Sequence, residues 1–144
     1  MPTIHALAYH VMLILRSNYM VFKIRTSKKT QEFFEAVEAS ENLQPYALSK
    51  LAISLSLKSD EPMAESDFKT DNNGLELNRQ TITGEYDELY KCLIAMKENH
   101  HIDDDEYFQK YIKAHLDRGA KYLYAEFRYG GDFITHLLST EEGI

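Results

Sequence analysis

Apolar and polar side chains alternate over residues 21–26, near the start of the chain. In an extended chain this order places Phe22 and Ile24 on one face and Lys23 and Arg25 on the other, because successive side chains of a strand point to opposite sides. The pattern predicts one short strand with an apolar face and a basic face.

Two helices are expected directly after this strand. Ser27 is a residue type that caps helices, and the helix that it starts should end near Asn42. Pro45 then starts a second helix, because proline at the first helical position gives up an amide that would be unpaired there. The apolar stripes at helical spacing are Phe33, Phe34 and Val37 in the first helix, and Leu48, Leu51, Ala52 and Leu55 in the second.

Further helices are expected after an acidic, weakly patterned connection over residues 58–74. A third helix should begin near Gly84, and a fourth near Asp103, whose spacing to Glu106 is that of a capping pair. A short helix is expected in the tail after residue 131. The apolar stripes are Tyr86, Leu89, Tyr90, Leu93 and Ile94 in the third helix, and Phe108, Tyr111, Ile112, His115, Leu116, Leu123 and Phe127 in the fourth.

The expected fold class is therefore mainly α: a short N-terminal strand followed by about four to five helices, with a ribbon-helix-helix-like first half. A chain of 144 residues fits a single domain. We expect residues 21–130 to form that domain, residues 131–144 a C-terminal tail, and residues 1–20 an N-terminal extension. Met20 directly precedes the strand, so two interpretations stay open: residues 1–19 are translated, or the chain starts at Met20.

Charge is distributed unevenly along the chain. The formal net charge is −7, with seven Lys or Arg against four acids in residues 1–58 and nine against nineteen in residues 59–144. A protein that is acidic as a whole has no general attraction for nucleic acid, so a contact with DNA requires a local basic face. The segment from Phe22 to Leu57 is the place where such a face is expected.

The single cysteine and the apolar stretch near the N-terminus both favour a cytoplasmic protein. Cys92 cannot form an internal disulfide, and its position on an apolar helical stripe predicts a buried, inert thiol. Residues 6–15 are apolar but are interrupted by His10 and are too short to cross a membrane, which takes roughly 20 residues. We therefore expect no membrane association.

The early basic residues are candidates for a DNA contact. In ribbon-helix-helix proteins, strands of two subunits pair and their outward side chains enter the major groove, which would be the role of Lys23 and Arg25. Lys28, Lys29 and Lys50 would neutralise the phosphate backbone nearby. The alternative is an edge strand whose charges only protect it from aggregation.

A second group of polar residues surrounds two glycines, Gly74 and Gly84. The Arg79 guanidinium offers a planar fork for a carboxylate or a phosphate, and Glu76, Glu85 and Asp87 are its candidate partners. The alternative is an internal ion-pair network that fixes the loop before the third helix. The complete polar cluster is Glu76, Asn78, Arg79, Glu85, Asp87, His115 and Arg118.

No catalytic, cofactor or metal site is predicted. The adjacent His100 and His101 are a poor metal-ligand pair, and the acids after them suit a helix N-terminus. Ser54 and Ser56 lie in a helix with no histidine near them in the sequence, so nucleophilic catalysis has little support. His115 lies on an apolar face and is expected to be structural. An enzyme would have to use Arg79, Glu85, Asp87 and His115.

Three segments together resemble the DNA sulfur-modification protein family DndE, over roughly Phe22 to Tyr124. They are the strand with the helix pair that ends in Leu51-Ala52-Ile53-Ser54-Leu55-Ser56-Leu57, then Glu76-Leu77-Asn78-Arg79-Gln80-Thr81 with Gly84-Glu85-Tyr86-Asp87, and finally His115-Leu116-Asp117-Arg118-Gly119.

The resemblance implies a small helical protein, as a homo-oligomer and specifically a tetramer, in the system that replaces a non-bridging phosphate oxygen of DNA with sulfur. It implies binding to duplex DNA, with preference for nicked duplex, through surface lysines, and no catalytic residue or cofactor. The implied partners are a cysteine desulfurase, an iron-sulfur protein and an ATPase of the same system. The alternatives are a protein-only adaptor that docks these components, and a ribbon-helix-helix transcriptional regulator.

Overall fold

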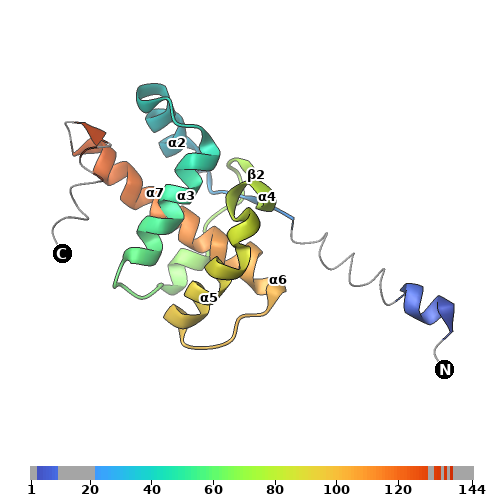
Figure 1. Cartoon of the computed structure of the whole chain (residues 1–144). Helices are drawn as coiled ribbons and strands as arrows, with labels where there is room; N and C mark the ends of the chain where they lie inside the picture. Colours follow the sequence, from blue (N-terminus) through green and yellow to red (C-terminus); the bar gives the residue numbers. More distant parts are fainter. Residues whose placement is uncertain (1–2, 10–21, 130–131, 134, 136, 138–144) are drawn as a thin grey trace.

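A computed structural model describes residues 3–9, 22–129, 132–133, 135 and 137 of the chain (Figure 1). The described part is mainly helical, as the sequence predicts, and it has a two-stranded sheet where the sequence predicts a single strand. Most of the N-terminal extension and of the tail lies outside the described residues. Within the short helix expected after residue 131, the described residues Phe133, Thr135 and Leu137 are helical. Within the described residues, no helix is both long enough and apolar enough to span a bilayer.

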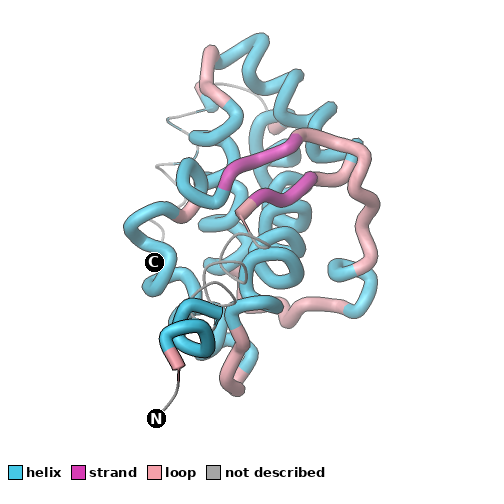
Figure 2. The backbone as a smooth tube through the Cα atoms, turned by 90° about the vertical axis from the view of Figure 1, so that its right-hand side faces the viewer, coloured by secondary structure: helices cyan, strands magenta, loops and turns pink. Residues whose placement is uncertain are grey.

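The sheet joins the start of the domain to its middle. Strand β1, Lys23–Arg25, pairs antiparallel with β2, Glu76–Asn78, and Ile24 lies opposite Leu77. Figure 2 shows the two strands side by side. Ile24 and Leu77 are buried while Lys23 and Arg25 are exposed, as the alternation predicts, but Phe22, which was expected on the face of Ile24, is 39% exposed. The sequence analysis did not predict β2, which is as short as β1 and lies in a segment that was interpreted as a polar cluster.

Helices α2, Lys28–Glu41, and α3, Pro45–Lys58, begin and end where they are expected. The Ser27 side chain accepts a hydrogen bond from the Thr30 amide, and Asn42 ends α2 in the left-handed conformation with φ of 55°. The buried face of α3 is turned relative to the predicted stripe, since Leu51 and Leu55 are only half-buried. Its buried residues are Leu48, Ser49, Ala52, Ile53 and Ser56.

The middle of the chain is built from short elements. A 3-10 turn, η1 at Glu65–Phe68, lies in the acidic connection, and α4, Arg79–Ile82, directly follows β2. A second 3-10 turn, η2 at Gly84–Tyr86, leads into α5, Asp87–Glu98, so the third predicted helix starts as a tighter turn.

The apolar stripe of α5 is not turned inward as a whole. Ile94 is buried, but Leu89 and Leu93 are exposed by 55% and 39%, and Met96 by 72%. Cys92 is also exposed, which makes the expectation of a buried thiol wrong. Ile94 is the one buried residue of α5, the partly buried Tyr90 and Ala95 also pack against the core, and Lys97 donates to the Leu57 and Ser59 carbonyls.

The last helical stretch runs as α6, Asp104–Glu106, the π-helix η3, Tyr107–Ile112, and α7, Lys113–Arg128. It begins after Asp103 as predicted, but the Asp103 side chain makes no capping hydrogen bond. Instead its carboxylate lies 3.4 Å from the imidazole of His101.

The core forms where α7 crosses α3 (Figure 1). At the crossing, Gly119 of α7 lies directly against the backbone of Ala52 in α3: a Cβ atom on Gly119 would come within 1.7 Å of the Ala52 carbonyl oxygen. The glycine therefore permits the close approach of the two helix backbones. This packing joins the first predicted half to the second in one domain.

Candidate functional site

The basic residues of β1 lie on the exposed face of the sheet. Lys23 and Arg25 point away from the core, and the Lys23 ammonium lies 3.8 Å from the Glu76 carboxylate of the neighbouring strand. The side chains of Lys23 and Glu76 are both about half exposed, so solvent weakens the ion pair between them. Arg25 forms no ion pair among the described residues.

Lys28 and Lys29 are exposed in the first turn of α2. The backbone amide of Lys28 donates to the Asp71 carboxylate at 2.9 Å, which attaches the start of α2 to the connection before β2. This hydrogen bond and one from the Asn73 amide lower the pKa of Asp71. The Lys28 ammonium lies 3.4 Å from the Gln31 side chain, and the Lys29 ammonium lies 6.0 Å from the Phe33 ring centre.

Lys50 lies on a different element from the other basic candidates. It is exposed on α3, with its ammonium 5.9 Å from the Tyr46 ring centre. A hollow of 280 Å³ separates it from α4 and η2, and Glu85 is among the residues that line this hollow. The structure thus brings Lys23, Arg25, Lys28 and Lys29 onto one continuous segment and leaves Lys50 on a neighbouring helix.

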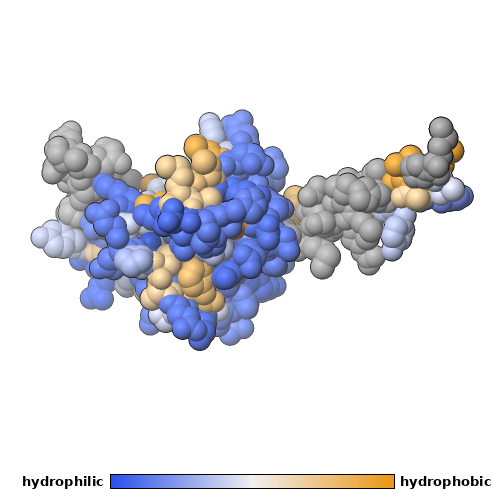
Figure 3. Space-filling model, turned by 90° about the horizontal axis from the view of Figure 1, so that it is seen from below, coloured by the Kyte–Doolittle hydropathy of each residue, from blue (hydrophilic) through white to orange (hydrophobic). Residues whose placement is uncertain are grey.

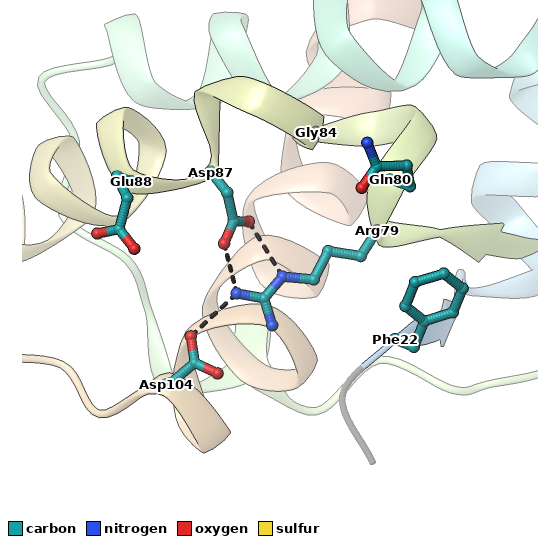
Figure 4. A pocket seen from close by; sticks show the side chains of 7 residues that line it. All are labelled: Phe22, Arg79, Gln80, Gly84, Asp87, Glu88 and Asp104. Atoms are coloured by element: carbon teal, nitrogen blue, oxygen red, sulfur yellow. Dashed lines mark hydrogen bonds and ion pairs between the residues drawn. The ribbon is translucent and has the colours of Figure 1, made fainter. Parts of the chain in front are cut away.

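Arg79, at the start of α4, is held by two carboxylates (Figure 4). Its Nε donates to Asp87 at 3.1 Å, and its Nη2 donates to both Asp87 and Asp104, the latter at 2.9 Å. Asp87 also accepts from the Thr83 hydroxyl at 2.8 Å. Asp104 was not among the predicted partners, because only the turn between α5 and α6 brings it back to α4.

The charges in this network stabilise one another. Burial opposes ionisation of both groups, but hydrogen bonds with Asp87 and Asp104 raise the pKa of Arg79, and the bonds from Arg79 and Thr83 lower the pKa of Asp87. Burial and the Asp87 charge raise the pKa of the Tyr107 hydroxyl nearby. The network therefore stays ionised at neutral pH and fixes α4 to α5 and α6.

A hollow of 420 Å³ opens beside the guanidinium, and its lining also includes Phe22, Gln80, Gly84 and Glu88 (Figure 4). Of the predicted partners of Arg79, only Asp87 contacts it. Glu76 pairs with Lys23 instead, and Glu85 is exposed beside the hollow next to Lys50. Two carboxylates already balance the Arg79 charge, which is the arrangement of the predicted ion-pair network.

His115 and Arg118 form a separate, buried network with α3. Ser56 Oγ lies 2.8 Å from the His115 Nδ1, and Arg118 donates to the Ser56 hydroxyl at 2.8 Å and to the Ser56 carbonyl at 2.7 Å. Arg118 also donates to the Glu61 carbonyl at 2.9 Å. Arg79 and Asp87 of the predicted polar cluster therefore belong to one network and His115 and Arg118 to another, whereas Glu76, Asn78 and Glu85 belong to neither.

The sequence could not predict that Ser56 pairs with His115, because the two residues are far apart in the chain. The pair does not make Ser56 an accessible nucleophile. His115 and Ser56 have no exposed surface, so no substrate reaches the hydroxyl. Burial, with the nearby Arg118 and Lys97, lowers the pKa of His115 to about 4, which keeps the imidazole neutral. His115 is buried on the apolar face of α7, as expected, but its Nε2 has no partner among the described residues.

Asp117 is a buried residue of the segment His115–Gly119, and the sequence analysis gave it no role of its own. Its carboxylate accepts from the Ser27 amide at 3.1 Å, the Thr30 hydroxyl at 2.7 Å, the Thr70 hydroxyl at 2.5 Å and the Lys113 ammonium at 2.7 Å. Asp117 thus joins α7 to the start of α2 and to the acidic connection. Its position four residues after Lys113 was the one available signal.

The described residues contain no group of three or more His, Cys, Asp or Glu side chains arranged to hold a metal ion. His100 points its Nδ1 to the His101 carbonyl at 2.8 Å, and His101 lies beside Asp103. These two imidazoles therefore have local partners within their own loop.

Comparison with known proteins gives one family and one fold. The family model described as DNA sulphur modification protein DndE matches residues 23–129. A crystal structure of DndE from Escherichia coli B7A, involved in DNA phosphorothioation modification, has a TM-score of 0.55 and 17% identity, covering 71% of this chain and 96% of that chain. A mutant DndE structure has a TM-score of 0.54 and 17% identity, with coverages of 70% and 95%. The comparison with curated proteins gave no match.

Proposed function

The chain belongs to the DndE family, which is involved in DNA phosphorothioation, and on this premise we propose that it is a non-catalytic accessory factor that binds DNA. It binds duplex or nicked duplex DNA as an oligomer, in the cytoplasm. Its partners are the other components of the sulfur-modification system: a cysteine desulfurase, an iron-sulfur protein and an ATPase.

The observation that carries this proposal is the group of exposed cations on β1 and the first turn of α2. Of Lys23, Arg25, Lys28 and Lys29, only Lys23 is in an ion pair with a carboxylate among the described residues. Such cations neutralise DNA phosphates without reading the sequence, which suits a factor that acts on the DNA backbone. Lys50 adds a further cation on α3.

Oligomerisation would increase the number of cations that contact one DNA molecule, because a single subunit has few of them. The whole chain carries a net charge of −7, so one copy has weak attraction for DNA. A tetramer that gathers four such basic segments would raise the effective affinity through multivalent binding. The exposed apolar side chains of α5 are available for assembly, and Figure 3 shows apolar patches within a mostly hydrophilic surface on the side where α5 lies.

The test is charge reversal in the first turn of α2. Lys28→Glu combined with Lys29→Glu should weaken duplex binding and reduce its dependence on salt, because log affinity falls with log salt in proportion to the phosphates contacted. Binding is measured by fluorescence anisotropy at two salt concentrations. The matched control is Lys69→Glu with Lys110→Glu, which makes the same charge change at exposed lysines of other elements. Equal binding by both double variants would refute the assigned face.

The second candidate is a protein-only adaptor, in which DNA is touched by a partner alone. It is favoured by the net acidity of the chain and by the apolar side chains that α5 exposes. Co-purification with the desulfurase or the ATPase without DNA, together with no mobility shift by the isolated protein, would decide for the adaptor.

The third candidate, a ribbon-helix-helix transcriptional regulator, uses only the first 58 residues. In such a dimer, strands of two subunits pair, whereas β1 pairs with β2 of the same chain along one edge. Sequence-specific operator binding by a dimer would be its signature.

A further inference from the structure

Two stacked aromatic rings each hold one cation, and the two cations come from opposite ends of the domain sequence. Phe33 of α2 and Tyr124 of α7 stack with their ring centres 4.3 Å apart and their planes 14° apart. The Lys29 ammonium lies 6.0 Å from the Phe33 ring centre, and the Arg128 guanidinium carbon lies 5.8 Å from the Tyr124 ring centre. We call these four side chains the α2–α7 ladder.

The ladder holds its cations without neutralising them. Lys113 and Arg79 are bound by carboxylates, which cancel their charge, whereas an aromatic ring attracts a cation and leaves its full charge and its N–H donors available. Lys29 and Arg128 are both exposed, and neither is in an ion pair with a carboxylate among the described residues. The rings also restrict the two long side chains, which lowers the entropy that a ligand must remove on binding.

We infer that Lys29 and Arg128 form a two-pronged contact to the DNA phosphate backbone, mounted on the stacked rings of Phe33 and Tyr124. The inference rests on the proposed function and extends the binding face from the start of α2 to the end of α7. Arg128 gives the contact its defined geometry, because a planar guanidinium can bind a phosphate through two parallel hydrogen bonds. Lys121, Tyr124 and Arg128 follow i, i+3, i+7 spacing, so Lys121 adds a cation on the same side of α7.

The experiment compares Arg128→Gln with Arg128→Lys in the full chain, using a short duplex and the same duplex with one nick. Arg128→Gln should weaken binding about 5- to 10-fold at low salt and reduce the salt slope by about one per subunit in contact. Arg128→Lys keeps the charge and should restore the slope but only part of the affinity, because the planar fork is lost.

The matched control is Lys110→Gln. Lys110 is an exposed lysine held over the rings of Phe68 and Tyr111, at 5.4 and 5.2 Å from their centres, at the other end of the last helical stretch. It has the same kind of ring contact outside the proposed face, so its loss should leave affinity and slope unchanged. Thermal unfolding of each variant separates a loss of binding from a loss of fold.

Tyr124→Leu tests whether the rings position the arginine. In the wild-type background it should weaken DNA binding, and in the Arg128→Gln background it should have no further effect on binding. If Arg128→Gln binds like the wild type while the double charge reversal in the first turn of α2 weakens binding, the α2–α7 ladder has only a structural role. The inference about Arg128 is then wrong, and the proposed DNA-binding function still holds. If the wild-type protein does not bind DNA, the proposed function fails with it.

Discussion

At the scale of single residues, the neutral imidazole of His115 makes stability depend on pH. The ordinary pKa of histidine is about 6.5, whereas burial and two neighbouring cations lower the pKa of folded His115 to about 4. Between these two values the unfolded chain binds a proton that the folded chain does not. The free energy of unfolding should therefore fall as pH drops from about 6.5 to about 4, and this contribution should level off below that range.

The expected size of this effect is up to about 3 kcal/mol, from the difference between the two pKa values. It is measured by urea unfolding at pH 7 and at pH 4.5, in the wild type and in His115→Gln. The variant removes the titrating group, so its stability should change less between the two pH values. An identical pH dependence in both proteins would mean that folded His115 binds protons normally.

Asp117 is the residue whose loss should cost most stability among the polar groups. Asp117→Asn removes the negative charge from a site that Lys113 and three further donors share, leaving the Lys113 side chain, which is only 11% exposed, without its counter-ion. Breaking a buried pair from one side typically costs about 3 to 5 kcal/mol. Chemical denaturation measures the loss, and the exposed Asp60→Asn, which makes the same chemical change, should have almost no effect.

At the scale of elements, the crossing of α3 and α7 reverses the usual effect of glycine in a helix. In an ordinary helix, Gly→Ala stabilises by up to about 1 kcal/mol, because alanine has the higher helix propensity. Gly119→Ala should instead destabilise the protein by about 1 to 3 kcal/mol or more, since the added Cβ meets the Ala52 carbonyl and the two backbones must move apart. Thermal unfolding measures the sign, with the exposed Ser54→Ala of α3 as a control.

The elements differ in how well the sequence predicts them, and length explains much of the difference. α2 and α3 each span 14 residues, and α2 begins after the capping Ser27 while α3 begins at Pro45, so their periods and ends are visible in the sequence. β2 has three residues and α4 has four, and such segments take their conformation from neighbours that are distant in the chain.

The sequence predicted several of the residues in the candidate site, but it did not predict most of the side chains that they contact. Arg79 and Asp87 are eight residues apart and do meet, since a turn of local structure joins them. Asp104 reaches Arg79, Ser56 reaches His115 and Asp117 reaches Thr30 through tertiary packing, and each of these pairs is separated by 25 residues or more in the sequence. The exposure of Cys92 was missed for a related reason: a helical stripe shows which side chains share a face but not whether anything covers that face.

At the scale of the whole molecule, the exposed stripe of α5 is the clearest place for a second protein surface. Leu89→Glu with Leu93→Glu should leave the free energy of unfolding of the subunit nearly unchanged, because both side chains are exposed. The same variant should shift the protein to smaller species in sedimentation velocity experiments, because charges replace apolar contacts between subunits. A variant that assembles like the wild type would place the interface on another face.

The contact between α3 and α7 also sets the order of events during protein synthesis. α3 ends at Lys58 and α7 ends at Arg128, about 70 residues later, so at 5 to 20 residues per second the nascent α3 waits roughly 4 to 14 s for its packing partner. During that interval its apolar face lacks the surface of α7 that covers it in the folded domain, and transiently exposed apolar surface is what chaperones bind. A premature stop before α7 makes the exposure permanent, and degradation by cellular proteases is the expected fate of such a fragment.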